Sequence, residues 1–271
     1  MTKGRFVQRS GAIVLRQAYL MRGSVARLVP LFAWVAVDMV LWGFITRYLN
    51  DVSHAGLNFV ATLLGAVLLW DFFARVMQGV TTAFLEDVWS RNFLNLFATP
   101  LSMSEYLSGL VASSIATSAI GLAVMLLLAT TCFGLSFLGY GLLLVPCIGL
   151  LFVFGIALGI AACAIVLRLG PASEWFVWPI PAVVAPFAGV FYPVATLPPW
   201  MQVVARLLPP SAVFEDMRRI VAGRSVSMME LAWGGGLAVA YLLLACWFFV
   251  RVYRHAVRTG LFARYSAENV G

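Results

Sequence analysis

Long apolar runs separated by short polar turns make up most of this chain. From residue 106 to residue 167 there is no Asp, Glu, Lys or Arg, whereas a helix needs only about 20 apolar residues to cross a bilayer. This stretch alone therefore holds two crossings. In lipid only helices and closed barrels satisfy their backbone polar groups, and a barrel would show apolar–polar alternation instead. The pattern predicts an all-α polytopic membrane protein.

We expect six transmembrane helices, bounded where polar or turn-forming residues interrupt the apolar runs. Their predicted ranges are residues 28–48, 57–80, 106–132, 139–167, 174–192 and 231–250. Ser102, with Glu105 three residues later, has the pattern of a capping box before the third span. Gly155, Gly159 and Cys163 place a small residue at every fourth position of the fourth span, which permits close helix contact. That contact is either internal packing or dimerisation, and we favour packing.

Nine of the twelve prolines lie between residues 171 and 210. Proline removes a backbone donor and clashes with the preceding helical turn, so we expect broken helices in this stretch. Two pieces, residues 200–208 and 211–222, are too short to cross and are predicted to be short re-entrant helices between spans five and six. They belong to an outer region, residues 193–224.

Composition and charge support a membrane protein and argue against other classes. Hydrophobic residues make up 62% of the chain and charged residues 11%, where soluble domains carry about 25% charged residues. The net charge of +7 is concentrated at the two ends and forms no basic run interleaved with aromatics, so nucleic acid is not an expected partner. Basic ends predict that both termini are cytoplasmic.

Three regions follow from this charge distribution. Residues 1–27 are predicted to form an N-terminal interface helix that lies on the inner surface and carries Arg5, Arg9 and Arg16 on one weakly amphipathic face. Residues 28–252 form the six-span domain, and residues 253–271 form a cytoplasmic tail. Membrane lipids are therefore expected partners.

No catalytic, metal or nucleotide site is expected in this chain. Lys3 is the only lysine, so the chain lacks the GxxxxGK[ST] loop that binds nucleotide phosphates. The cysteines stand singly in apolar surroundings, without a CxxC pair or a histidine cluster, and we expect them to be buried small hydrophobic residues: Cys132, Cys147, Cys163 and Cys246.

Two stretches resemble the signature regions of the type 2 family of ABC exporter permeases. One is EDVWSRNFLNLFATPLSMSEYLSG, beginning at Glu86, and the other is AGVFYPVATLPPWMQVVARLLPPSAVFEDMR, beginning at Ala188. The second match is the more specific and includes Gly189, Phe191, Tyr192, Pro193, Leu197, Pro198, Trp200, Pro209, Glu215 and Arg218. Leu208 departs from the family pattern, which usually has a polar residue before the later proline.

The resemblance implies a permease subunit in a bacterial inner membrane, assembled from two copies of this chain and two ABC ATPase subunits. ATP and Mg²⁺ would bind to the ATPase subunits, while the permease itself is not an enzyme and holds no cofactor. The substrate would be amphipathic, either a lipid-linked glycan or polysaccharide or a hydrophobic small molecule, exported from the cytoplasm or the inner leaflet. Residues 86–104 would be the coupling region, with contacts at Glu86, Asp87, Trp89, Arg91, Phe93 and Phe97.

Charged residues within spans are costly and need partners or water. Asp71 and Arg75 are four residues apart and therefore share a helix face, where they form either a structural ion pair or a substrate contact; Asp38 has no evident local partner. Aromatic residues that line a substrate path, or else face lipid, are Trp34, Trp42, Trp175, Trp178, Phe187 and Phe191. The alternative functions are a proton-coupled secondary transporter, with Asp38 and Asp71 as the relay, and a non-transporting membrane scaffold subunit.

Overall fold

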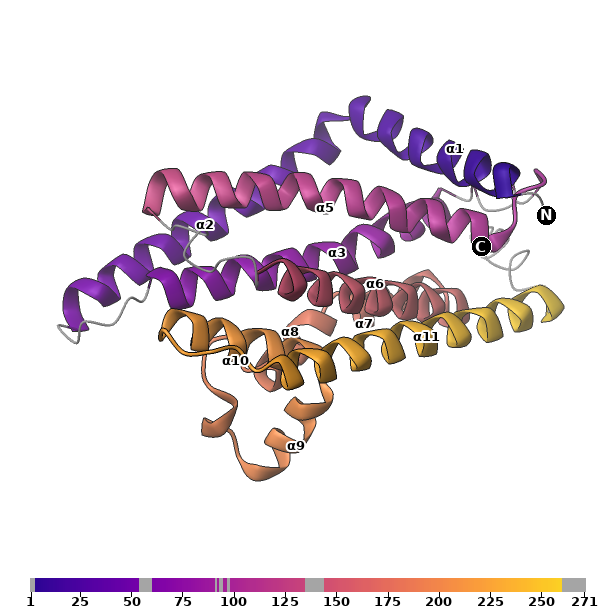
Figure 1. The fold of residues 1–271 in the computed structure, drawn as a ribbon. Coiled ribbons are helices and arrows are strands. Elements are labelled where there is room, and N and C mark those ends of the chain that lie inside the picture. The colour runs from indigo at the N-terminus through magenta and orange to yellow at the C-terminus, as the bar shows by residue number, and fades with distance from the viewer. Residues whose placement is uncertain are drawn as a thin grey trace.

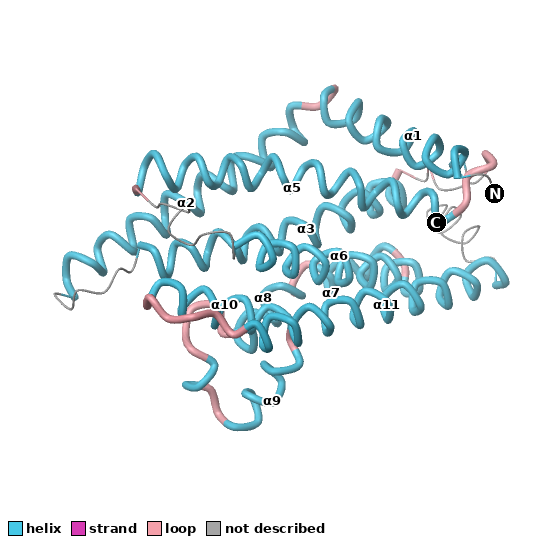
Figure 2. The backbone as a smooth tube through the Cα atoms, in the orientation of Figure 1, coloured by secondary structure: helices cyan, strands magenta, loops and turns pink. Residues whose placement is uncertain are grey.

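The computed structural model describes residues 3–53, 60–90, 92, 95–96, 98–134 and 144–259, and within these ranges it contains helices and no strands (Figures 1 and 2). The α-helices are α1 (Lys3–Arg22), α2 (Val25–Ser53), α3 (Gly65–Trp89), α5 (Met103–Phe133), α6 (Leu144–Leu169), α7 (Glu174–Val177), α8 (Ile180–Ala188), α9 (Pro199–Leu207), α10 (Pro209–Val221) and α11 (Met228–Thr259). A π-helical turn, Val60–Leu64, leads into α3, and 3₁₀ turns lie at Pro171–Ser173 and Val194–Thr196. The predicted all-α class is confirmed.

Four helices of the described chain are long and apolar enough to cross a membrane: Thr62–Trp89, α5, α6 and α11. The chain is thus a helical multi-pass membrane protein. The predicted first span lies within α2, a continuous helix of 29 residues. The predicted fifth span is instead divided at Trp178 and Pro179 into α7 and α8. The apolar helical stretch Glu174–Ala188 is only about 22 Å long at 1.5 Å per residue.

Helix α3 packs against both α5 and α6, and α6 also packs along α11. A Cβ added at Gly155 would lie 3.0 Å from Val76 Cβ, and one at Gly159 would lie 3.0 Å from the Met77 carbonyl oxygen. These glycines therefore let α6 approach the backbone of α3, which confirms that the small-residue stripe serves packing within the chain. Phe73 and Phe154 stack across the same contact, with ring centroids 5.5 Å apart.

Different helices lie at the two ends of the bundle. Helix α1 begins and α11 ends at the same end (Figure 1). At the start of α11, Trp233 Nε1 donates a hydrogen bond to the Arg206 carbonyl oxygen of α9 at 3.1 Å. The two predicted short helices are found here as α9 and α10, beside the first turns of α11 and therefore away from the end where α1 begins.

Candidate functional site

A polar cavity of about 600 Å³ opens among α1, α2, α3, α5 and Trp178 at the end of α7. It contains all three predicted intramembrane charges, Asp38, Asp71 and Arg75. Its other polar lining residues are Gln17, Arg27, Gln78, Thr82, Glu86, Ser113, Ser114 and Thr117. In a chain with 62% hydrophobic residues, this concentration of polar groups makes the cavity the strongest candidate site.

The charges of the cavity come from two helices. Asp38 lies on α2, while Asp71 and Arg75 lie one turn apart on α3, and the three charges act on one another electrostatically. Arg75 crosses to α5, where a Cβ on Gly121 would approach its Cδ to 2.8 Å. Near the end of α3, Arg27 Nε lies 3.5 Å from Glu86 Oε1. The sequence identified the three charged residues, but only the fold brings Asp38 into one cavity with Asp71 and Arg75.

The predicted aromatic residues separate into different places. Trp34 and Trp178 line the polar cavity. Trp42 stacks on Phe191 with ring centroids 5.2 Å apart, and Phe187 meets the ring of Trp200 at 6.1 Å. Trp175 is exposed and is not among the cavity's lining residues.

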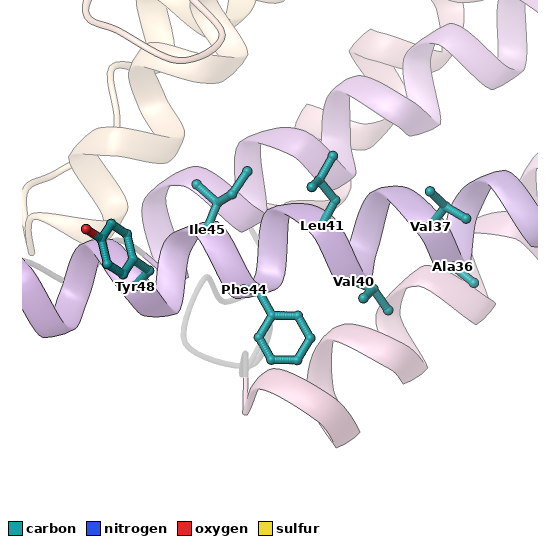
Figure 3. Close-up of a pocket in the computed structure, with 7 residues that line it drawn as sticks. All are labelled: Ala36, Val37, Val40, Leu41, Phe44, Ile45 and Tyr48. Carbon is teal, nitrogen blue, oxygen red and sulfur yellow. The ribbon is translucent and has the colours of Figure 1, made fainter.

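A second hollow, of about 700 Å³, runs along the exposed face of α2 and is almost entirely apolar. Figure 3 shows its lining side chains spread along that one helix: Ala36, Val37, Val40, Leu41, Phe44, Ile45 and Tyr48. An apolar face of this kind suits acyl chains or another helix.

Helix α1 is fixed to the bundle through buried carboxylates. Arg16 Nη1 donates to Asp87 Oδ2 at 2.9 Å, Arg16 Nη2 bonds Asp87 Oδ1, and the Tyr106 hydroxyl donates to Asp87 Oδ2 at 2.7 Å. The hydrogen bond to Asp87 is the main cause that raises the pKa of the Arg16 guanidinium above its usual value. Arg9 Nη1 lies 3.4 Å from Glu105 Oε2. The face of α1 that carries Arg9 and Arg16 therefore points toward α3 and α5.

The capping box predicted before the third span is present at the start of α5. Glu105 N donates to Ser102 Oγ at 3.3 Å, and Ser102 N donates to Glu105 Oε2 at 2.8 Å. Glu105 is fully buried, so its carboxylate both caps α5 and receives Arg9 of α1. A local sequence motif thus also takes part in a long-range contact.

The predicted coupling residues differ in accessibility. Glu86, Asp87 and Trp89 lie in the last turn of α3. Trp89 is exposed, but Asp87 is only 1% exposed and its carboxylate is bound to Arg16 and Tyr106 inside the chain. Arg91, Phe93 and Phe97 lie outside the described residues.

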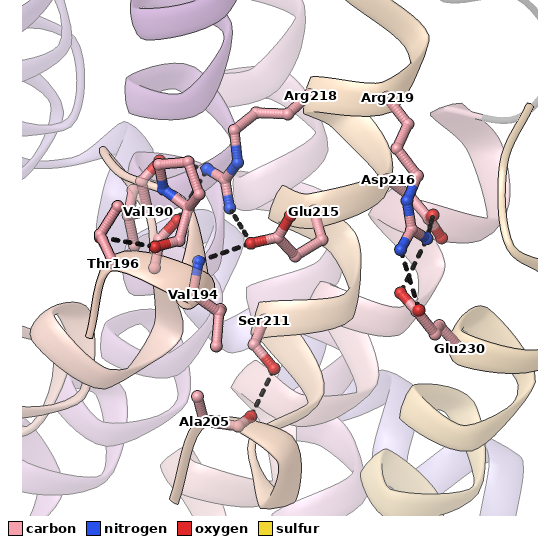
Figure 4. A network of polar contacts seen from close by, with 12 residues as sticks. Val190, Val194, Thr196, Ala205, Ser211, Glu215, Asp216, Arg218, Arg219 and Glu230 are labelled. Carbon is pink, nitrogen blue, oxygen red and sulfur yellow. Dashed lines mark hydrogen bonds and ion pairs between the residues drawn. The ribbon is translucent and has the colours of Figure 1, made fainter. Parts of the chain in front are cut away.

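The residues of the second signature stretch form one hydrogen-bonded corner, part of which is drawn in Figure 4. Arg218 Nη1 donates to the Gly189 carbonyl oxygen at 2.8 Å and Arg218 Nη2 donates to Glu215 Oε1 at 3.0 Å, while Val194 N donates to the same oxygen at 2.6 Å. Gly189 has a φ of +61°, which favours glycine because it has no Cβ. The corner is held together by a charged pair with backbone partners on both sides.

The remaining signature residues shape the chain around this corner. The Tyr192 hydroxyl donates to the Pro186 carbonyl oxygen at 2.8 Å. Pro193 and Leu197 flank the 3₁₀ turn Val194–Thr196, and Pro198 immediately precedes α9. Trp200, in the first turn of α9, is 62% exposed.

A second ion-paired group joins α10 to the start of α11. Arg219 Nη1 lies 2.8 Å from Asp216 Oδ1 and 2.7 Å from Glu230 Oε2 (Figure 4). The hydrogen bond to Glu230 is the main cause that raises the pKa of the Arg219 guanidinium above its usual value, and the hydrogen bond to Asp216 adds a smaller effect. This group fixes the orientation of α10 against α11.

The four cysteines are free. Cys147 and Cys163 are buried as expected and Cys246 is partly buried, whereas Cys132 is exposed, contrary to the expectation for it. Cys132 lies in the last turn of α5, where Thr130 and Thr131 are exposed as well. Among the described residues, no three His, Cys, Asp or Glu side chains are grouped closely enough to hold a metal ion.

Several contacts of these sites carry no signal in the sequence. Arg16 and Asp87 are 71 positions apart, and Tyr106 resembles any other aromatic residue of an apolar span. Gln17, Gln78 and Thr117 join the cavity only because α1, α3 and α5 meet there. The one indication available for Gln78 was that it is a polar residue within a mostly apolar stretch.

No protein-family model matches this chain, and no curated protein matches it with significant similarity.

Proposed function

We propose that this chain is the transmembrane permease subunit of an ATP-driven ABC exporter, which moves an amphipathic substrate out of the cytoplasm or the inner leaflet. The observation that carries the proposal is that one helix, α3, connects a surface at its end to the polar cavity at its middle. Its last turn presents Glu86 and the exposed Trp89, and its middle carries Asp71 and Arg75 of the polar cavity. A partner that pushes on the end of α3 would move the cavity wall as a rigid body.

The attachment of α1 supports this proposal. The Arg16–Asp87 and Arg9–Glu105 pairs join α1 to the end of α3 and the start of α5. A soluble subunit bound at this end would therefore meet three connected helices rather than a flexible loop. In this arrangement Asp87 holds the coupling region to α1 and α5 through Arg16 and Tyr106, while Glu86 and Trp89 supply contact surface.

The proposed topology has six crossings, with α2, α3, α5, α6, the α7–α8 pair and α11 as the crossing elements. Both termini are then cytoplasmic in a bacterial inner membrane, and α9 and α10 lie at the outer side. The α7–α8 pair, about 22 Å long, is shorter than the hydrocarbon core of about 30 Å. Its ends then need cover from protein, and at the end of α8 the Gly189–Arg218 corner provides it.

The partners in this proposal are an ABC ATPase subunit, which would bind ATP and Mg²⁺, a second copy of this chain, and membrane lipids. The exposed apolar face of α2 offers a surface for lipid or for that second copy. The substrate classes suggested by the resemblance are a lipid-linked glycan or polysaccharide and a hydrophobic small molecule.

The decisive experiment is to purify the tagged chain from the membranes of cells that express it natively and to measure vanadate-sensitive ATP hydrolysis in the eluate. Wild-type chain should bring ATPase activity with it, and the double variant Glu86→Arg with Trp89→Ala should lose it. Asp51→Arg, an exposed charge change in the last turn of α2, is the matched control. The proposal is contradicted if the double variant and the Asp51→Arg control bring equal ATPase activity with them, or if the isolated chain alone hydrolyses ATP.

Orientation can be tested separately by cysteine labelling in a Cys132→Ser background. Ser90→Cys, after α3, should react with a membrane-impermeant maleimide only after permeabilisation. Gly223→Cys, after α10, should react in intact cells with an opened outer membrane. The reverse pattern would refute the proposed topology.

A proton-coupled secondary transporter is the second candidate, because two carboxylates, Asp38 and Asp71, share one cavity with Arg75. Transport that survives ATP depletion but collapses with an uncoupler would favour this mechanism over the exporter.

A further inference from the structure

We propose that the polar cavity binds an organic cation, the ammonium-like headgroup of an amphipathic molecule. Its volume of about 600 Å³ is within the range of about 300–1,000 Å³ that is typical of small-molecule sites. The site lies between α2 and α3, with side chains of α1 and α5 completing the wall.

The charge of the cavity favours a cation. Its lining carries three carboxylates, Asp38, Asp71 and Glu86, and two guanidinium groups, Arg27 and Arg75. Glu86 lies against Arg27, which leaves two carboxylates facing one guanidinium in the rest of the cavity. With both carboxylates ionised, the lining carries one surplus negative charge, which attracts a positive group and disfavours an anion.

One carboxylate oxygen lacks a hydrogen-bond donor. Among the described residues, Asp71 Oδ2 is buried and accepts no hydrogen bond. A buried carboxylate oxygen in this state is energetically unfavourable unless a positive or donor group reaches it. A bound cation in the cavity would supply that group.

The aromatic lining supports the same ligand class. Trp34 and Trp178 line the cavity and are 66% and 41% exposed. The faces of indole rings attract cations, most strongly where water is excluded, and the same rings contact the apolar part of an amphipathic molecule. Carboxylates together with exposed tryptophans are the groups that bind an organic ammonium ion.

Binding of a cation in the cavity does not depend on which energy source drives transport. As the substrate site of an exporter it rests on the function proposed above, and it would then assign a cationic amphiphile as the substrate. Binding is therefore tested on the purified full chain in detergent, without nucleotide or ATPase partner.

The probes are tetraphenylphosphonium and tetraphenylborate, two ions of nearly equal size and opposite charge, measured by equilibrium dialysis against empty micelles. After subtraction of micelle uptake, we expect the phosphonium to bind at least about tenfold more tightly than the borate, because opposite charges attract strongly where water is excluded. Equal affinities, or tighter binding of the borate, would overturn the proposal.

Variants locate the binding. Asp38→Asn and Asp71→Asn should each weaken phosphonium binding by about tenfold, and Trp34→Ala by about threefold. Asp51→Asn and Trp247→Ala change exposed residues that do not line the cavity, and should leave the affinity unchanged. Wild-type affinity in both folded Asp variants refutes the site.

A variant that should bind the phosphonium more tightly is also needed, because misfolding can only weaken binding. Arg27→Gln removes a half-exposed guanidinium and frees Glu86, so phosphonium binding should tighten by about threefold. If Asp71→Asn does not fold, Asp38→Asn and Arg27→Gln decide, and unchanged binding in both overturns the proposal. Selective phosphonium binding without an associated ATPase would refute the exporter alone, whereas an associated ATPase without charge preference would refute the cation site alone.

Discussion

Arg16 of α1 lies face to face with Asp87 of α3, with both terminal guanidinium nitrogens bonded to the two carboxylate oxygens. Asp87 is only 1% exposed, and the Tyr106 hydroxyl of α5 donates to the same carboxylate. Three helices therefore meet at one buried charge. Such a group stabilises a specific arrangement only while all its partners are present.

Removal of one member of this group should therefore be costly. Arg16→Ala leaves Asp87 buried without its positive partner, and breaking a buried ion pair in this way costs about 3–5 kcal/mol. We expect the thermal unfolding midpoint in detergent, followed by circular dichroism, to fall clearly. Arg5→Ala, at an exposed position of α1, is the control. The double variant Arg16→Ala with Asp87→Asn should recover part of the loss, and strictly additive effects would contradict the pairing.

The contact between α1 and α5 depends on a glycine. A Cβ at Gly109 would lie 2.6 Å from Ile13 Cβ and 2.9 Å from the Ser10 carbonyl oxygen, so Gly109→Ala should push α1 away from α5. Overpacking of this kind costs about 1–3 kcal/mol, and cleavage by trypsin near the α1–α2 turn should become faster. Adding Ile13→Ala should restore little protection, because the Cβ at position 13 and the Ser10 carbonyl oxygen both stay in place. Gly149→Ala, which meets nothing within 4 Å, should have no effect on this cleavage.

The packing of α6 on α3 has a similar requirement. Gly159→Val places side-chain atoms against the Met77 carbonyl oxygen and Val80, where even a Cβ would be 3.0 Å from each. We expect a loss of about 1–3 kcal/mol, measured by denaturant unfolding in mixed micelles. Gly235→Val, on α11 with open space around it, is the matched control. Equal stability of the two variants would show that the close approach is not needed.

The outer corner depends on Arg218. Arg218→Gln removes the charged bonds to Gly189, Val190 and Glu215, and among the described residues it leaves the partly buried Glu215 bonded to the Val194 amide alone. Charge-assisted hydrogen bonds of this type contribute about 1.5–3 kcal/mol each, so the segment before α9 should loosen. Hydrogen exchange of the Val194 amide should accelerate strongly. The exposed Arg224 provides the control Arg224→Gln, and unchanged exchange in Arg218→Gln would refute the role of the corner.

Local patterns predicted much of the helical framework. The capping box at Ser102 and Glu105, the small-residue stripe at Gly155 and Gly159, and the short helices after Pro198 and Leu208 are all found. The prediction of the fifth span was less accurate. Residues 174–192 are divided into α7 and α8 at Trp178 and Pro179, and α8 ends before Gly189.

The sequence by itself determined where helices form, because hydrophobic length, caps and prolines act over a few neighbouring residues. Only the tertiary structure decided that the basic face of α1 meets the buried carboxylates Asp87 and Glu105, and that Asp38 shares a cavity with Asp71 and Arg75. Charges of opposite sign pair across any helix contact that brings them together. The physical cause of that contact is the packing of whole helix surfaces, which no short stretch of sequence contains.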